Sequence, residues 1–401
     1  MPTPYFVERF NAIADRGDLD FEAWFNVEKE PDRSWDVNPG EWRFRARYIP
    51  EWSLFGWKQH LPLVELRKTR PDLFVQEHHW VHLAVGAFAA RVAASRIALR
   101  VLPNFDTWSR RTWWREASKH LLFRFIDGAK VPGPDGARLA RRYGLSKNRI
   151  HRVTQSIDVE HYRQAHSYRA SYRTQKRKDL GLHGCVFVYV GRLWRGKGVD
   201  YLIDAFRTVQ REYSDVSLLL LGDGVDEAVF RAKAADLPGV KFAGFVQRQE
   251  LPQYYALADV MVFPTLGDPH GLVVEEAMSA GLPVISSEAA GDIRRRVLDG
   301  ETGFIVPPAN IEVLADRMLK MAREPQLRQK FAIRASSAVT NVTHAQYASD
   351  FARFVTAVMA MPPRRTPAAW FARLTGYSLL TVGLRVRRPS ATLISDGATI
   401  E

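Results

Sequence analysis

The chain has 401 residues, 46% of them hydrophobic, so it can bury a large core and is expected to form two domains. Its single cysteine, Cys185, excludes an internal disulfide and fits a reducing compartment. The start of the chain lacks the basic segment and apolar block of a signal peptide, which predicts a cytoplasmic protein. The most apolar long stretch, residues 81–102, is interrupted by arginines and is not expected to span a membrane.

The formal net charge of +13 is unevenly distributed along the chain. Between Arg91 and Lys178 there are 21 Lys or Arg residues against 6 Asp or Glu, a local balance of +15. A block of this kind favours nucleic acid or an anionic membrane surface as a partner. A well-solvated surface without a partner would have the same composition, so the charge alone leaves all three open.

The first part of the chain predicts alternating helices and strands. Apolar residues recur at helical spacing from Phe6 to Ala14, and a strand is expected at Phe21 to Phe25. The next expected elements are a helix over Trp57 to Thr69 and a strand over Pro71 to Gln76. A further strand is expected at Ile97 to Leu102.

Two clusters in this part of the chain imitate metal sites. Glu77, His78 and His79 follow the strand that ends at Gln76, but three adjacent residues of an extended segment cannot converge on one ion. The pair Asp18 and Asp20 imitates a metal-binding D-x-D pattern, but it lies at the start of an early strand. No metal ligand is therefore expected.

Thr107 to Phe125 predicts an amphipathic helix in which aromatic and basic residues are interleaved. Trp113 and Trp114 lie among the basic residues Arg110, Arg111 and Arg115. Such a helix suits a membrane interface, which we favour. Ordinary core packing or stacking on nucleic-acid bases would use the same residues.

An apolar strand at Cys185 to Val190 opens the second half of the chain and leads into the loop Gly191 to Gly198. This loop matches the G-x4-G-K pattern of phosphate-binding loops and lies between a strand and a helix, as that pattern requires. The residue after Lys197 is Gly198, however, and not the Ser or Thr that binds magnesium in such loops. A nucleotide hydrolase is therefore disfavoured.

Val260 to Pro264 predicts a second buried strand, followed by the loop Thr265 to His270 and a helix over Gly271 to Ala280. A helix start after a parallel strand suits a phosphate, and Gly271 would let it come close. Asp268 and Glu276 are eight residues apart, which suits recognition of hydroxyl groups by two separate carboxylates. Alternatively, Asp268 is an N-cap, and Glu275 and Glu276 lie on a solvated helix face.

These two segments resemble a known family. DPHGLVVEEAMSAGLPVIS, followed by AAGDIRRRVLDGETGFIVPP, resembles the donor-binding half of retaining glycosyltransferases of family 4, with Asp268 and Glu276 at its Glu-x7-Glu positions. GRLWRGKG resembles the family's G-R-L-x-x-x-K-G segment. The resemblance implies an α/β protein of GT-B fold, with two Rossmann-like doubly wound domains facing a deep cleft. Members normally begin with a strand, and that first strand is missing before Pro2.

The resemblance also implies the domain limits. Residues 1–160 are expected to form the acceptor-binding domain, 161–184 a basic linker and 185–361 the donor-binding domain. The tail, residues 362–401, is expected to be disordered or interfacial.

The resemblance assigns roles to particular residues. Arg192 and Lys197 are expected to neutralise the donor diphosphate, Asp268 to orient the sugar and Glu276 to hold the ribose. Further donor contacts are expected from Gly191, Phe245, His270, Gly271, Leu272 and Val273. On the acceptor side, the candidates are Pro4, Glu77, His78 and Asn104, of which Glu77 and His78 have a plain loop role as the alternative. The family uses no bound metal or other cofactor, and its donor is a nucleoside diphosphate-sugar.

The sequence thus predicts a metal-independent retaining glycosyltransferase, peripheral at the cytoplasmic face of an anionic membrane. Its expected acceptor is lipid-linked or part of a surface glycan, and nucleic acid is not an expected partner. The alternative function is that of a non-catalytic, membrane-associated scaffold protein. A chain extended upstream of Met1 is expected to be more stable, because it would supply the missing strand.

Overall fold

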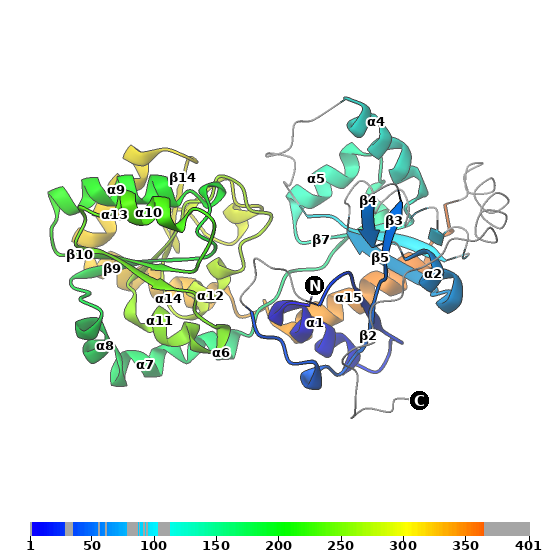
Figure 1. The fold of residues 1–401 in the computed structure, drawn as a ribbon, viewed down its shortest axis with the longest axis horizontal. Helices are drawn as coiled ribbons and strands as arrows, with labels where there is room; N and C mark the ends of the chain where they lie inside the picture. The colour runs from blue at the N-terminus through cyan, green and yellow to red at the C-terminus, as the bar shows by residue number, and fades with distance from the viewer. Residues whose placement is uncertain are drawn as a thin grey trace.

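The structure is a computed structural model. It describes residues 2–28, 35–54, 57–60, 62–77, 95–102 and 113–364, together with positions 87, 89, 90 and 93. The described chain forms two α/β lobes, one on each side of Figure 1. Among these residues, no helix is long and apolar enough to cross a membrane.

The C-terminal lobe is built on a six-stranded parallel sheet with the order β11-β10-β9-β12-β13-β14. Its strands are β9 (Cys185–Val190), β10 (Val216–Leu221), β11 (Val240–Gly244), β12 (Val260–Phe263), β13 (Val284–Ser287) and β14 (Gly303–Val306). The central strands are apolar throughout because helices bury both faces of the sheet. The strand order reverses between β9 and β12, and open α/β sheets bind ligands at the carboxyl ends of the strands at such a reversal.

Helices cover the two faces of this sheet with separate apolar clusters. They are α9 (Val199–Glu212), α10 (Glu227–Lys233), α11 (Leu251–Leu257), α12 (Val273–Ser279), α13 (Ile311–Arg323) and α14 (Pro325–Ala338). The apolar face predicted from Val199 to Val209 is buried on α9.

The N-terminal lobe contains a four-stranded parallel sheet with the order β5-β6-β7-β8. Its strands are β5 (Leu73–Glu77), β6 (Arg96–Arg100), β7 (Gly128–Val131) and β8 (Ile150–Arg152). Two further pairs lie beside it, β1 (Glu22–Phe25) with β2 (Arg45–Tyr48), and β3 (Glu51–Leu54) with β4 (Trp57–His60). Helices α1 (Pro4–Ala14), α2 (Leu63–Thr69), α4 (Trp113–Leu122) and α5 (Pro134–Arg142) also belong to this lobe.

One expected helix in this lobe was placed wrongly. Trp57 to Thr69 is not a single helix, because Trp57–His60 pairs as an antiparallel strand and α2 begins only at Leu63. Pro62 separates the two elements. The other helix and strands predicted up to residue 102 lie within a few residues of their expected limits. Of the helix predicted over Thr107 to Phe125, Trp113–Leu122 is helical and residues 107–112 lie outside the described residues.

The parallel strands of the N-terminal lobe form two separate sheets. β1 and β2 are parallel, like β5 to β8, but they form a pair of their own. Trp24 on β1 and Phe74 on β5 lie with their ring centroids 5.5 Å apart, so the two parts are neighbours in space. In the described part of the chain, no strand lies between them.

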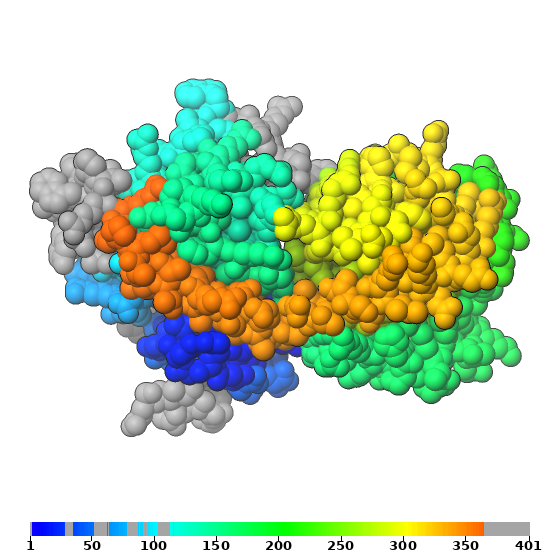
Figure 2. Space-filling model, turned by 180° about the vertical axis from the view of Figure 1, so that it is seen from behind, coloured from blue at the N-terminus to red at the C-terminus, as the bar shows by residue number. Residues whose placement is uncertain are grey.

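Helix α15 (His344–Ala360) joins the two lobes. It falls inside the range 185–361 expected for the donor-binding domain, but it packs against the N-terminal lobe. Its apolar residues Tyr347, Phe351 and Phe354 pack with Ile13 of α1 in one cluster of the N-terminal lobe. Figure 2 shows the orange segment running from the C-terminal lobe onto the N-terminal one. The last helix of the predicted donor domain therefore belongs to the core of the N-terminal lobe.

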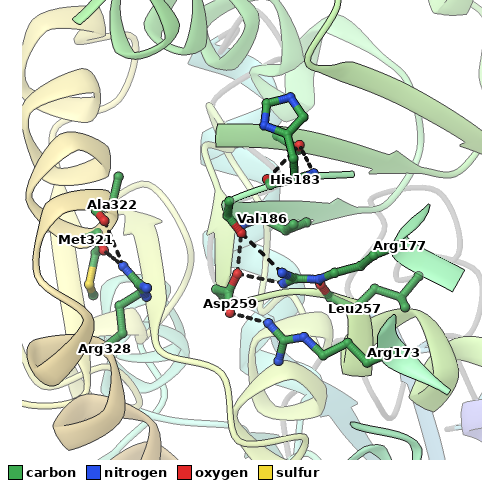
Figure 3. Close-up of polar contacts among 11 residues, drawn as sticks. Arg173, Arg177, His183, Val186, Leu257, Asp259, Met321, Ala322 and Arg328 are labelled. Atoms are coloured by element: carbon green, nitrogen blue, oxygen red, sulfur yellow. Dashed lines mark hydrogen bonds and ion pairs between the residues drawn. The ribbon is translucent and has the colours of Figure 1, made fainter. Parts of the chain in front are cut away.

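The expected basic linker, residues 161–184, is a folded part of the C-terminal lobe. It forms α7 (Ala165–Ser171) and α8 (Arg173–Asp179) after the short α6 (Val159–Arg163). Asp259 accepts hydrogen bonds from Arg173 at 2.5 Å, Arg177 at 2.7 Å and the Val186 backbone at 2.8 Å (Figure 3). Burial alone would raise the pKa of Asp259, but these two cations hold it below its usual value. Part of the basic charge thus stabilises the fold and does not face a partner.

Candidate functional site

The loops after β9 and β12 pack against each other at the point where the strand order reverses. The Leu266 N–H donates a hydrogen bond to the Gly196 carbonyl at 3.1 Å. Gly198 has φ +71°, and a Cβ atom there would lie 2.1 Å from the Pro264 carbonyl oxygen. Only glycine permits both this conformation and this approach. The two segments singled out in the sequence therefore form one site.

Lys197 and Asp268 form an ion pair at the centre of this site. The Lys197 ammonium donates to Asp268 Oδ2, and the two side chains are only 16% and 14% exposed. Asp268 Oδ1 accepts a hydrogen bond from the His270 N–H at 2.8 Å. Burial alone would raise the pKa of Asp268, but the Lys197 charge lowers it, so the carboxylate is ionised. Because α12 begins at Val273, Asp268 is not its N-cap.

The remaining predicted diphosphate ligand, Arg192, is exposed at the same edge of the sheet. Its guanidinium lies 5.8 Å from the centre of the Trp194 ring, and its carbonyl accepts a hydrogen bond from the Tyr189 hydroxyl at 2.8 Å. Gly191 precedes it with φ +152°. Phe245, partly buried, directly follows β11, two strands away from β9.

Glu275 and His270 form a buried charged group with Arg296. His270 Nε2 lies 2.9 Å from Glu275 Oε1, and Arg296 donates to Glu275 Oε2 at 2.9 Å. Burial would raise the pKa of Glu275, but Arg296 and His270 lower it to about 2. Burial and the Arg296 charge lower the pKa of His270. His270, expected as a donor contact, therefore bonds to Glu275 of helix α12.

At Gly271, the backbone conformation and the packing require glycine, in addition to the close approach of a phosphate that the sequence predicts. Its φ is +72°, and a Cβ atom would lie 2.5 Å from the Phe263 ring. The residue is thus required for the turn and for packing on β12. Leu272 and Val273, the other expected donor contacts of this turn, are partly buried.

Glu276 is completely buried, so the expected solvated helix face is wrong for it and for Glu275. The Tyr5 hydroxyl donates to Glu276 Oε1 at 2.6 Å, and the Tyr255 hydroxyl donates to Oε2 at 3.0 Å. Burial raises the pKa of Glu276, although both phenols favour its ionised form. Tyr5 lies on α1 and Tyr255 on α11, so the carboxylate is held from both lobes at once.

Two further contacts hold the lobes together near the site. Arg248 forms an ion pair with Glu8 of α1, and Glu8 also lies 2.9 Å from His344 Nε2. Helix α5 contacts the segment between β13 and β14. The Asp135 N–H donates a hydrogen bond to the Asp292 carboxylate at 3.0 Å, and the Asp292 N–H donates one to the Asp135 carboxylate at 2.9 Å. The lobes therefore meet through charged groups and hydrogen bonds.

The expected acceptor-side residues are only partly described. Pro4 is the first residue of α1 and precedes Tyr5, and Glu77 ends β5 and pairs with Arg100 at 2.5 Å. His78 and Asn104 lie outside the described residues. Within the described ranges, no cluster of three His, Cys, Asp or Glu side chains is suited to a metal ion.

Sequence reasoning missed the tyrosines that surround Glu276. Tyr5, Tyr255 and the nearby Arg248 come from segments without a motif. Only Tyr5 had a local signal, since it follows the acceptor-side candidate Pro4. Their convergence follows from the contact between α1 and the C-terminal lobe.

The C-terminal lobe matches a known protein family. Residues 184–324 match the family described as Glycosyl transferases group 1. This range runs from β9 to the end of α13 and includes both loops of the site. The resemblance is thus confirmed here, whereas membership of family 4 in particular stays a prediction.

Curated relatives match over part of their length. The "Alpha-D-kanosaminyltransferase" of Streptomyces kanamyceticus is 26% identical over 245 residues, which are 59% of this chain and 59% of that protein. The "Phosphatidyl-myo-inositol mannosyltransferase" of Mycobacterium leprae (strain TN) is 36% identical over 160 residues, 39% of this chain and 42% of that protein. The chain thus spans about half the length of the curated relatives that it matches.

The fold matches a solved structure over most of both chains. The crystal structure of Anabaena Alr3699/HepE in complex with UDP and glucose has a TM-score of 0.70 at 19% identity. The match covers 89% of this chain and 96% of that one. The predicted α/β architecture of GT-B type is therefore confirmed.

The buried Glu275 gives a testable dependence of stability on pH. Its folded-state pKa of about 2 lies below the ordinary 4.5, so it stabilises the fold above that value and less as the pH falls. Glu275→Gln should lower the free energy of unfolding by about 3 kcal/mol at neutral pH. The deficit relative to wild type should shrink as the pH falls toward about 3. Chemical denaturation across this pH range measures it.

A matched control is Glu288→Gln, which removes the exposed partner of Arg294. This variant should lose less than about 1 kcal/mol at any pH. Equal losses for the two variants would contradict the structural role of Glu275.

Proposed function

We propose that this chain is a retaining glycosyltransferase that moves a sugar from a nucleoside diphosphate-sugar to an acceptor held between the lobes. The observation that carries the proposal is the meeting of the β9 and β12 loops, which places Lys197 beside Asp268 at the reversal of strand order. Ligands of open α/β sheets bind in such crevices. The family match covers both loops.

The charges at this edge suit departure of a nucleoside diphosphate. When the bond between the sugar anomeric carbon and the diphosphate oxygen breaks, its electrons go to that oxygen. Arg192 and Lys197 would stabilise the growing negative charge. The acceptor hydroxyl would attack from the same face and pass its proton to the leaving phosphate, while Asp268 would orient the sugar. This proposal needs no metal ion or other cofactor.

The proposed acceptor is lipid-linked or part of a surface glycan, and the protein would bind peripherally to the cytoplasmic face of a membrane. Helix α4 supports this, because Trp113 is 82% exposed, Leu121 55% and Trp114 42%. Aromatic side chains on an amphipathic helix are typical of membrane interfaces. The mannosyltransferase relative is named for a lipid acceptor, phosphatidyl-myo-inositol.

A second candidate is a non-catalytic, membrane-associated scaffold. The observation in its favour is that Glu276, the proposed ribose ligand, is completely buried beneath Tyr5 in this structure. Hydrolysis or transfer of a donor distinguishes the two, because a scaffold shows neither.

Lys197→Met should abolish most transfer, since it removes a cation from the leaving diphosphate. The expected loss in kcat/KM corresponds to about 2–4 kcal/mol of transition-state stabilisation. The donor is first chosen by thermal shift with UDP, GDP and ADP, and transfer or donor hydrolysis is then followed by release of the nucleotide. Arg195→Met is the control, because Arg195 lies in the same loop but pairs with Asp226. Equal rates for Lys197→Met and wild type would remove the proposed site.

Tyr5→Phe tests whether Glu276 binds the donor ribose. Glu276 is completely buried and Tyr5 donates to its Oε1, so a ribose reaches this carboxylate only if the phenol moves away. Without this hydrogen bond, worth about 1 kcal/mol, the nucleoside diphosphate should bind roughly fivefold more tightly. Tyr255→Phe removes the other bond to Glu276 from within the same lobe and should not increase affinity. Calorimetric titration measures both, and unchanged affinity of Tyr5→Phe would exclude competition between Tyr5 and the ribose.

Membrane binding predicts co-sedimentation with anionic liposomes and little with neutral ones. Each engaged Lys or Arg contributes about 1 kcal/mol, and binding should fall with salt as the Debye length shrinks from ~10 to ~3 Å. Trp113→Ser should weaken sedimentation severalfold. Ile333→Ser, at a 64% exposed position of α14, should not. Equal binding to neutral liposomes, or preference for nucleic acid, would refute a membrane role.

A further inference from the structure

Arg296 lies in the segment between β13 and β14, and its side chain is only 10% exposed. Its guanidinium donates hydrogen bonds to four oxygens of the same lobe. They are Glu275 Oε2 at 2.9 Å, the Gly291 carbonyl at 3.0 Å, the Gly271 carbonyl at 3.2 Å and the His270 carbonyl. Three of these acceptors are backbone carbonyls, so the ion pair with Glu275 is only part of what Arg296 does.

Two of these carbonyls belong to the residues that hold Asp268. The His270 N–H donates to Asp268 Oδ1 at 2.8 Å, and the Gly291 N–H donates to the Asp268 carbonyl at 2.8 Å. The carbonyls of His270 and Gly291 both accept from Nη2 of Arg296. One nitrogen atom therefore fixes both residues that donate a backbone hydrogen bond to Asp268.

The side chain of His270 is fixed by the same group. Its Nε2 lies 2.9 Å from Glu275 Oε1, while Arg296 donates to the other oxygen of Glu275. His270 is thus held at its N–H, its carbonyl and its ring. Because the Lys197 ammonium donates to Oδ2 of Asp268, both oxygens of that carboxylate have a fixed direction.

This arrangement requires an arginine. A guanidinium presents five N–H donors in a planar fork, whereas an ammonium has three donors on one atom. The four acceptors come from three separate stretches of chain, namely the β12 loop, helix α12 and the segment after β13. A lysine at position 296 would keep the charge beside Glu275 but could not reach all of these oxygens.

Arg328 of α14 is a matched comparison within the same lobe (Figure 3). It also donates to two backbone carbonyls, those of Ala322 at 2.9 Å and of Met321. Both belong to the last turn of α13, and the charge of Arg328 acts on Cys185 at the amino end of β9. Arg328 is therefore bound in the same way, but at the opposite end of the sheet from the donor loops.

We propose that Arg296 is a positioning residue for sugar transfer, which acts by holding Asp268 in place beside Lys197. Loss of its bonds to the two carbonyls would let the β12 loop and the segment after β13 shift, and Asp268 would shift with them. A displacement of about 1 Å at a reacting group can cost about a hundredfold in rate. The effect on the sugar rests on the proposed function, whereas the hold on Asp268 does not.

The first test is the steady-state kinetics of Arg296→Lys, with the donor chosen by thermal shift. This variant should lower kcat at least tenfold. Its affinity for the nucleoside diphosphate alone, which carries no sugar for Asp268 to orient, should change less than twofold. Arg328→Lys is the control and should keep kcat within twofold. Unchanged kcat in Arg296→Lys, or equal losses in the two variants, would overturn the proposal.

The second test does not depend on activity. The Asp268 carboxyl is titrated by carbon-13 NMR and assigned by comparison with Asp268→Asn. The His270 N–H favours the ionised carboxylate, so Arg296→Lys should raise the pKa of Asp268 and Arg328→Lys should leave it unchanged. An unchanged pKa in Arg296→Lys would overturn the positioning role even if kcat falls.

Two further outcomes have a defined meaning. If wild type neither transfers sugar nor hydrolyses a donor, but the pKa of Asp268 rises in Arg296→Lys alone, the positioning role stands and the proposed function falls. If Arg296→Lys does not fold, Arg296→Gln combined with Glu275→Gln replaces it in both tests, because this pair of changes leaves no unpaired buried charge. Glu275→Gln alone is then the control.

Discussion

Burial of charge behind β12 is the constraint on which the rest of the structure depends. Asp268, Glu275 and Glu276 are all buried or nearly so, and each has a different kind of partner. Asp268 meets a lysine, Glu275 an arginine and a histidine, and Glu276 two phenols. A buried carboxylate without a partner would destabilise the folded state. The pairing of these three carboxylates therefore fixes the positions of the β9 loop, the segment near Arg296 and helix α1.

The partners of the three carboxylates differ in where they lie and in how far they are exposed. The group around Glu275 lies within one lobe and braces the β12 loop, whereas Lys197 and Asp268 keep some exposure and are available to a ligand. Glu276 couples the lobes, because its two oxygens are held from α1 and α11. Opening between the lobes would separate Tyr5 from Glu276, so the ribose binding proposed for Glu276 would depend on the arrangement of the lobes.

Helix α15 makes the two lobes interdependent in a second way. It follows the C-terminal lobe in sequence, yet Tyr347 and Phe351 pack beneath the N-terminal sheet. The same helix supplies Tyr347, which contacts Lys130 and Arg9, and His344, which contacts Glu8. The buried Lys130 of β7 thus depends on a residue 217 positions further along the chain.

The sequence by itself determined the elements and motifs whose signal is local. The apolar strands β9 and β12, the amphipathic α9, and the loops carrying Lys197 and Asp268 follow from patterns within a few residues. Only the tertiary structure decided the burial of Glu276 under Tyr5, the turn at Gly271 against Phe263, and the place of α15. Those features depend on contacts between distant segments, and a residue's local pattern does not record which distant side chain supplies its charge or hydrogen bond. Arg173 and Arg177 show the same limit, because the sequence shows the many basic residues of 161–184 but not that these two pair with the partly buried Asp259.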